Sequence, residues 1–208
     1  MSHAMLRLAI LSFSALAFPV YAADVGRVIL AAGQTVAIRD NQAVPLAFGA
    51  AIRDKDTLRT GAASNLQVRF VDDSLVSLRE NSELRVENFV FNGKDDGSER
   101  AFFRLLKGGL RQITGIIGRR NHANYGLDSL VATIGVRGTD FAATLCQQDC
   151  RNDDGSPAKD GLFGRVIGLS AGTNKLAVTN TAGESILGIN ENFYVADRQS
   201  PLQRLLEP

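Results

Sequence analysis

The side chains that could support hydrolytic chemistry are few in this chain, and histidine is the scarcest of them. The 208 residues contain two histidines, His3 and His122, and His3 lies in an N-terminal stretch that we expect to be removed. A serine nucleophile needs a neighbouring base to activate it, and the chain has no Gly-x-Ser-x-Gly turn that could present such a serine. His122 stands beside Arg119, Arg120 and two asparagines, which is typical of an exposed loop. We therefore predict no catalytic residue and no enzymatic activity.

Carboxylates occur in adjacent pairs, a pattern that can serve glycosidases or calcium-binding loops. The pairs are Asp72-Asp73, Asp95-Asp96 and Asp153-Asp154. Each stands among residues that favour turns, and the residue pattern of an EF-hand loop is absent from the sequence. Hairpin corners explain the pairs more simply, so we predict neither a metal site nor a cofactor.

The two cysteines, Cys146 and Cys150, lie close together in the segment Cys-Gln-Gln-Asp-Cys. An oxidising compartment favours a local disulfide between them. Metal ligation is the alternative, but it would require two further ligands. We predict the disulfide, whose short loop should contribute at the low end of about 2 to 4 kcal/mol.

Positive charge is concentrated between Glu99 and Asp128, where no acidic residue interrupts a series of cations. On alternating strands these side chains could form one face for an anionic partner, such as a carboxylated glycan, a lipid headgroup or an acidic protein surface. The alternative is that they pair with Glu and Asp of neighbouring strands. Few aromatic residues lie among them, which argues against nucleic acid as a partner. The candidate partner-binding residues are Arg104, Lys107, Arg111, Arg119 and Arg120.

The first 22 residues have the features of a cleavable signal peptide. Arg7 precedes an apolar run over residues 8–18, and Ala22 ends a stretch that signal peptidase could recognise. The apolar run is short for a membrane span of ~20 residues, and no later segment is long and apolar enough. We expect cleavage after Ala22, a periplasmic location and no transmembrane segment in the mature chain. Arg7 is one of 23 basic residues, so its removal leaves equal numbers of basic and acidic residues, 22 of each. The mature chain then has no net charge that would attract DNA or anionic lipid.

The rest of the chain alternates between apolar and polar residues, as in the series Leu66, Val68 and Phe70. A period of two is typical of half-buried antiparallel strands, and the frequent turn residues favour a roll or sandwich over alternating strands and helices. We predict an all-β fold, either an antiparallel two-sheet roll or sandwich or a short β-helix. Residues 201–206 predict a short C-terminal helix, with Ser200 as its N-cap and Pro201 in its first position.

Residues 133–141 place a charged turn between two apolar runs. Gly135 and Gly138 mark places where the backbone turns tightly or approaches another segment. Arg137 would be costly to bury unpaired, so we expect a bidentate contact to a carboxylate or to carbonyls at a strand end, and Asp140 is a near candidate. With Thr139, these residues form a predicted structural motif in which the arginine fastens a turn to the domain.

Several further segments accompany this motif in order along the chain. They are Gly49, Asp56-Thr57-Leu58-Arg59-Thr60-Gly61, Phe70, Asp73-Ser74, Asn81-Ser82-Glu83-Leu84, and Leu106-Lys107-Gly108-Gly109-Leu110-Arg111 with Thr114-Gly115. Together the segments resemble the FecR-like periplasmic domain family over residues 24–141. The resemblance implies a periplasmic domain that acts through protein contacts, relaying the state of an outer-membrane receptor to a membrane-anchored sigma-factor regulator. Because the sequence shows neither a cytoplasmic anti-sigma segment nor a transmembrane helix, we expect a stand-alone exported form.

The expected organisation has four parts: a signal peptide over residues 1–22, a FecR-like β domain over 23–145, a polar loop with the disulfide over 146–161, and C-terminal strands with the short helix over 162–208. The expected function is a non-enzymatic periplasmic binding or signalling module with an envelope protein as partner. Binding of an envelope polysaccharide or another anionic polymer through the basic segment is the alternative.

Overall fold

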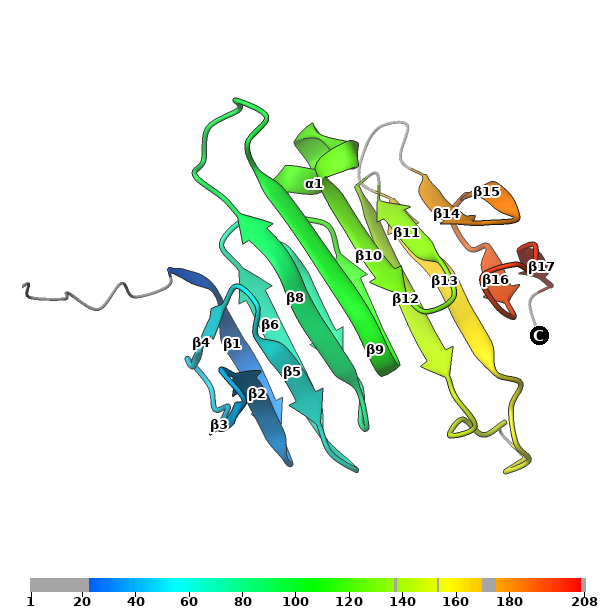
Figure 1. The fold of residues 1–208 in the computed structure, drawn as a ribbon, viewed down its shortest axis with the longest axis horizontal. Coiled ribbons are helices and arrows are strands. Elements are labelled where there is room, and N and C mark those ends of the chain that lie inside the picture. Colours follow the sequence, from blue (N-terminus) through cyan, green and yellow to red (C-terminus); the bar gives the residue numbers. More distant parts are fainter. Residues whose placement is uncertain (1–22, 137, 153, 170–174, 207–208) are drawn as a thin grey trace, which may run out of the picture.

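A computed structural model describes residues 23–136, 138–152, 154–169 and 175–206. Within these residues the chain forms seventeen strands, one short helix and one 3₁₀ turn (Figure 1). The first strands are β1 (Asp24–Ala32), β2 (Thr35–Arg39), β3 (Gln42–Pro45), β4 (Ala51–Arg53), β5 (Thr57–Thr60), β6 (Asn65–Phe70), β7 (Leu75–Leu78), β8 (Glu83–Val90) and β9 (Arg100–Ile113). After α1 (Ile116–Arg120) and the 3₁₀ turn (His122–Asn124) come β10 (Tyr125–Ser129), β11 (Thr133–Val136), β12 (Thr139–Cys146), β13 (Gly161–Leu169), β14 (Leu176–Asn180), β15 (Gly183–Leu187), β16 (Asn192–Val195) and β17 (Gln203–Leu205).

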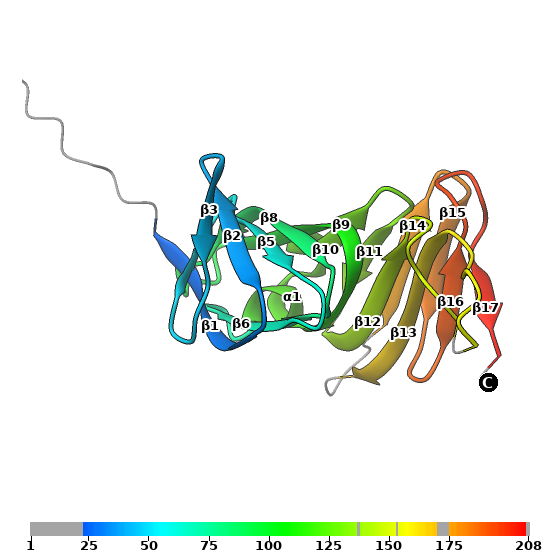
Figure 2. The ribbon, with the colours of Figure 1, turned by 90° about the horizontal axis from the view of Figure 1, so that it is seen from below.

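The strands lie in two layers, an upper and a lower one as seen in Figure 2. Hydrogen-bonded neighbours give the order β4-β1-β6-β7-β9-β12-β13-β16-β17 in the lower layer. The upper layer has the order β3-β2-β5-β8-β9-β10-β11-β14-β15. β9 belongs to both layers, because residues 100–107 pair in the upper layer and residues 108–113 pair in the lower one. All strands therefore belong to one connected sheet.

The core lies between the layers, because each layer turns its apolar side chains toward the other. Phe70 of the lower layer stacks on Phe89 of the upper layer, and Phe70 also meets Phe103 edge-on, with ring centroids 5.1 Å apart in both pairs. Along β6 and β8 every second side chain is buried over most of the strand. The alternation in the sequence thus separates a shared core from two outer faces.

The passage of β9 from one layer to the other depends on Gly108. Its φ of +72° lies in the left-handed region that glycine adopts without strain. A Cβ at this position would lie 2.7 Å from the carbonyl oxygen of Asn81 and 2.7 Å from the Cα of Ser82. The Ser82 hydroxyl also accepts a hydrogen bond from the Gly109 N–H at 2.9 Å. Glycine therefore permits both the turn of β9 and its close approach to the neighbouring chain.

The predicted all-β class is confirmed, while the finer architecture differs from a purely antiparallel arrangement. β9 and β10 run parallel, so the connected sheet is mixed, and it does not close on itself. A parallel pair needs a longer connection than a hairpin, and α1 with the 3₁₀ turn provides it between β9 and β10. No helix in the described part of the chain is long and apolar enough to cross a membrane.

The prediction of a C-terminal helix over residues 201–206 is wrong, because this segment contains the strand β17. Gln203, Arg204 and Leu205 pair with Tyr194, Phe193 and Asn192 of β16. A helix of six residues would gain few internal hydrogen bonds for the cost of its first turn. Pairing with the open edge of β16 satisfies the backbone groups instead.

Candidate protein-binding face

The residues that could suggest an enzyme lie in turns and in the 3₁₀ segment. His122 is exposed, and its Nδ1 lies 2.7 Å from the carbonyl oxygen of Gly118. Asp72, Asp96 and Asp154 each accept hydrogen bonds from the backbone N–H and the hydroxyl of the serine two residues later. These contacts stabilise the turns in which the carboxylates lie. Among the residues that the structure describes, no group of three or more His, Cys, Asp or Glu could hold a metal ion.

The predicted disulfide between Cys146 and Cys150 is confirmed. The two Cα atoms are 5.4 Å apart, within the range that a disulfide can bridge. Cys146 ends β12 and is buried, whereas Cys150 lies in the loop that leads to β13. The disulfide therefore holds the start of this loop against the end of the strand.

The charged turn after β11 contains Asp140, the carboxylate considered for Arg137. The prediction for Arg137 falls outside the described residues and stays a prediction. Asp140 is bound by Arg111, whose Nε and Nη2 donate to its two carboxylate oxygens at 2.9 and 2.6 Å. Gly138 has a φ of +70°, which explains the need for glycine in the turn. Gly135 lies on β11 opposite Ala177, and the N–H of Thr139 donates to the Thr114 hydroxyl at 3.1 Å.

The five cations of the predicted partner-binding segment are divided among three places. Arg104 and Lys107 lie on the upper-layer part of β9, Arg111 lies on its lower-layer part, and Arg119 and Arg120 lie in α1. Nearest charged atoms are 3.2 Å apart between Arg104 and Asp128, 3.5 Å between Lys107 and Asp149, 2.6 Å between Arg111 and Asp140, and 3.3 Å between Arg120 and Glu99. Arg119 donates to the backbone oxygen of Thr114 at 2.9 Å. Partner binding by this set stays a prediction, and much of its charge is already matched by local acids.

A buried polar network links the lower layer to β10. The Gln112 amide donates to the Tyr125 hydroxyl at 2.9 Å, and Asp72 accepts from Ser74. The second carboxylate oxygen of Asp72 has no hydrogen-bond partner in the described part of the chain. Burial raises the pKa of Asp72, although its hydrogen bonds from Ser74 act in the opposite direction. A Cβ on Gly115 would lie 2.4 Å from Asp72, so a glycine is needed where the two segments meet.

A row of outward-facing side chains crosses the lower layer at right angles to the strands. Successive register pairs join Gln67 to Ser77, Ser77 to Arg111, Arg111 to Ala142, Ala142 to Arg165, Arg165 to Asn192, and Asn192 to Leu205. We call these seven residues the trough. All of them except Leu205 have buried or half-buried neighbours along their strands, whereas the residues of β17 are exposed. At about 4.8 Å per strand spacing, the trough is about 29 Å long.

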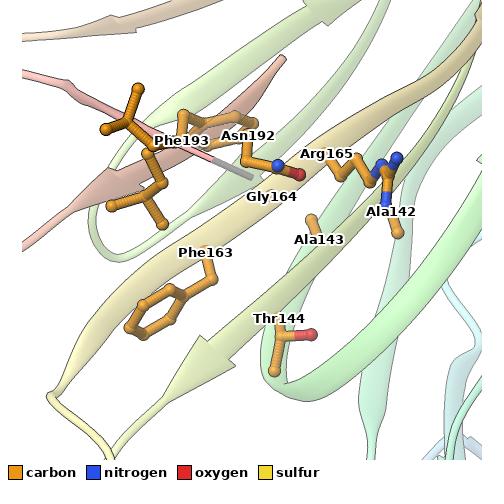
Figure 3. A pocket seen from close by; sticks show the side chains of 10 residues that line it. Ala142, Ala143, Thr144, Phe163, Gly164, Arg165, Asn192 and Phe193 are labelled. Atoms are coloured by element: carbon orange, nitrogen blue, oxygen red, sulfur yellow. The ribbon is translucent and has the colours of Figure 1, made fainter. Parts of the chain in front are cut away.

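Two surface hollows lie on the trough. The first has a volume of about 190 Å³ and is lined by Gln67, Ser77 and Arg111, with the apolar side chains of Leu75 and Ile113 beside them. The second, of about 320 Å³, lies nearer the C-terminus (Figure 3). Its lining includes the trough residues Ala142, Arg165, Asn192 and Leu205, together with Thr144 and Phe163. Because the side chains of Ser77 and Ala142 are small, the protein surface is lower at these two positions than at the larger side chains beside them.

Arginines flank the trough on both sides. On one side, the next row of paired residues begins at Arg69 and continues through Leu75 and Ile113 to Asp140. On the other side, the Arg79 side chain lies over Gly109, where a Cβ would be 3.2 Å from its Cδ. Both arginines are exposed, and neither forms an ion pair or a side-chain hydrogen bond with any residue that the structure describes.

Reasoning from the sequence identified Arg111 but missed the other residues of this face. Arg69, Arg79 and Arg165 belong to three segments that look unremarkable when each is considered alone. Their alternation with buried residues indicates outward-facing positions, and that signal was available in the sequence. Which of these positions become neighbours depends on strand pairing, which the sequence pattern does not specify.

Comparisons with known proteins place this fold among related domains. Residues 56–156 match the family model described as FecR protein. Two crystal structures of a "putative anti-sigma factor" from Parabacteroides distasonis ATCC 8503 are similar to this chain, with TM-scores of 0.51 and 0.50 and 14% sequence identity in each case. The alignments cover 73% of this chain and 59% of the solved chains, and an identity this low shows a shared fold alone. No curated protein matches the sequence significantly.

The match to the family model includes all of β5 to β12 and the first part of the loop after β12, with both cysteines of the disulfide. It also includes the motif residues from Gly135 to Asp140 on which the resemblance in the sequence was based. Residues 56–156 of the chain therefore form a region of the FecR protein family.

Proposed function

We propose that this chain is a non-enzymatic, exported signalling module that acts in the periplasm through contacts with an envelope protein. The match of residues 56–156 to the FecR protein family and the fold shared with the Parabacteroides structures support a role in signalling through protein contacts. The N-terminal sequence supports export. The partner of the module would be a protein of the cell envelope.

The observation that carries this proposal is the composition of the outer face of the lower layer. This face combines arginines with exposed or half-exposed apolar side chains, and two hollows interrupt it. Arginine, methionine and aromatic residues are enriched at protein interfaces, whereas lysine is depleted there. All of the cations on and beside the trough are arginines: Arg69, Arg79, Arg111 and Arg165.

The alternative of polysaccharide binding depends on the predicted basic segment. Four of its five cations lie within 3.5 Å of a carboxylate, which reduces the charge that they could offer to an anionic polymer. No contact in the described residues favours a glycan over a protein. We therefore keep protein binding as the proposed function.

Photo-crosslinking in the native host tests the proposal directly. A benzoylphenylalanine residue placed at Thr144, beside the trough, should form an adduct with another envelope protein after irradiation. The matched control carries the same residue at Thr133, an exposed position on β11 in the upper layer. Equal adducts from both positions, or adducts from neither, would contradict a specific contact face.

Cell fractionation tests the proposed location separately. We expect the mature chain in the periplasmic fraction, beginning at Ala23 when its N-terminus is determined by mass spectrometry. A full-length chain that stays in the cytoplasm would reject the location, whatever the result of crosslinking.

A further inference from the structure

We propose that the trough binds an extended acidic segment of a partner polypeptide, and this proposal rests on the proposed function. The segment would lie across the strands of the lower layer, with carboxylates directed to the arginines and an apolar side chain in the larger hollow. The inference specifies the chemistry of the partner, which neither the family nor the fold provides.

The dimensions of the trough suit an extended chain. A length of about 29 Å corresponds to roughly nine residues at about 3.3 Å each. The trough is continuous in register from β6 to β17, since each of its residues pairs directly with the next. Rows of larger side chains, including Leu75 and Ile113 on one side and Phe163 and Tyr194 on the other, run alongside it. A narrow, straight occupant therefore fits better than a broad surface.

The charges around the trough call for an anionic occupant. Arg111 lies within it, and Arg69 and Arg79, which are exposed and have no ion pair among the described residues, flank it. Asp140 is the acidic member of the adjoining row, and its carboxylate is already engaged by Arg111. The Arg111 side chain is still 51% exposed, so its guanidinium can donate to a second carboxylate while Asp140 holds it in place.

The upper layer provides a contrast within the same molecule. There Arg59 pairs with Glu83 at 2.9 Å, and Arg104 lies between Glu87 at 3.4 Å and Asp128 at 3.2 Å. The cations of that outer face thus have acidic neighbours on adjacent strands. On the lower layer, by contrast, Arg69 and Arg79 have no acidic partner among the described residues.

A polypeptide explains the mixture of side chains better than a polyanionic glycan does. Leu205 is 39% exposed and borders the larger hollow together with Phe163. Contact with an apolar side chain of the partner would remove these apolar groups from water, which is favourable. A carboxylated glycan has no such side chain. Arginine also binds carboxylates through two parallel hydrogen bonds, a geometry that suits Asp and Glu side chains.

A binding experiment with defined probes tests this inference. The probe is a fluorescein-labelled synthetic peptide of about twelve residues with Glu at alternate positions and a central Leu, measured by fluorescence anisotropy with the mature chain. We expect binding that weakens as salt rises from about 50 to 300 mM, because exposed charges are screened. A matched peptide with Lys in place of Glu should not bind.

Two variants locate the binding site. The pair Arg69→Glu and Arg79→Glu should weaken binding at least about tenfold, a loss near 1.4 kcal/mol. Neither arginine has a partner among the described residues, so the fold should survive, and circular dichroism melting checks this. The control pair, Lys94→Glu and Lys175→Glu, changes the net charge equally at exposed positions outside the lower face and should leave the affinity unchanged.

Leu205→Ser tests the apolar contact. It should weaken binding of the Leu peptide severalfold and have little effect on a peptide with Ser at the central position. Equal losses with both peptides would show that the central side chain does not occupy the hollow, and would overturn that part of the proposal.

The remaining outcomes separate this inference from the proposed function. No binding of the acidic peptide at about 1 mM, or equal weakening by the control pair, would overturn the acidic-segment proposal. If polygalacturonate binds the trough more tightly than the peptide does, the trough is a site for a glycan and not for an acidic polypeptide. If crosslinking at Thr144 still captures an envelope protein in either case, protein binding stands and only the partner chemistry is wrong.

Discussion

At the scale of single residues, the unusual feature is the carboxyl group of Asp72 inside the core. The side chain is fully buried, and one of its oxygens has no partner among the described residues. Its position is fixed by two hydrogen bonds from Ser74 and by the close packing of Gly115. A buried carboxyl group with incomplete hydrogen bonding makes stability depend on pH.

Because burial raises the pKa of folded Asp72 above its unfolded value, the folded chain holds this proton more tightly. Stability should therefore fall as pH rises from about 4, the unfolded value, through the folded pKa. Asp72→Asn removes the charge, so it should increase the free energy of unfolding at pH 7, and this advantage should shrink as the pH approaches 4. Urea unfolding of both proteins at the two pH values measures the difference. An Asn variant that is less stable at pH 7 would show that the carboxylate is ionised and paired.

Gly108 offers a second prediction at this scale. Gly108→Ala places a Cβ at 2.7 Å from backbone atoms in a conformation with φ of +72°, so we expect a loss well above 1 kcal/mol in the free energy of unfolding. Gly93 is the matched control, because its φ of +76° is similar but no atom lies within 4 Å of a Cβ there. Gly93→Ala should cost about 1 kcal/mol. Equal losses in denaturant titrations would mean that φ alone, and not the crowding at the β9 crossing, sets the cost.

At the scale of elements, β9 organises the molecule because it pairs with four strands. Its first part lies between β8 and β10, and its second part lies between β7 and β12. This arrangement separates Arg104 from Arg111 by placing them on different layers. A series of cations that is continuous in the sequence thus contributes to two outer faces.

The loop between β12 and β13 is closed at its start by the disulfide, and only a short segment is enclosed. Replacing Cys146 and Cys150 together with Ser should lower the free energy of unfolding by about 2 kcal/mol or less. Reducing agent should lower the melting temperature of the wild type to that of the variant. A wild-type melting temperature that reducing agent leaves unchanged would argue that the bond is not formed in solution.

At the scale of the whole molecule, the folded unit extends beyond the region matched by the family model. The match ends at residue 156, yet β13 pairs with β12 along its full length and β16 and β17 extend the same layer. Leu162, Val166, Phe193 and Val195 of these strands are buried in the common core. The second half of the trough also belongs to them.

A chain ending at residue 160 should therefore fail to unfold as one cooperative unit. It would expose the edge of β12 and the apolar surface that β13 and β16 cover, which favours aggregation. Calorimetry and size-exclusion chromatography of the truncated protein measure both effects. If it remains monomeric with an unchanged melting temperature, the C-terminal strands are dispensable to the fold.

The features that could be predicted from the sequence are local ones. The alternation around Leu66, Val68 and Phe70 indicates strands because neighbours two residues apart share a face. The short separation of Cys146 and Cys150 was sufficient to predict their bond. The C-terminal segment was misassigned because its local signals favour a helix, whereas its structure depends on the open edge of β16.

The sequence by itself determined the strand character of the chain, the disulfide and the resemblance to the FecR family, since each depends on residues close together or on a recognisable order of motifs. Only the tertiary structure decided that Asp140 binds Arg111, 29 residues away, and that seven separate strands align the trough. The physical reason is that strand pairing joins distant segments through backbone hydrogen bonds, which are nearly the same for every residue. Register therefore follows from how the whole core packs, and the binding face follows from register.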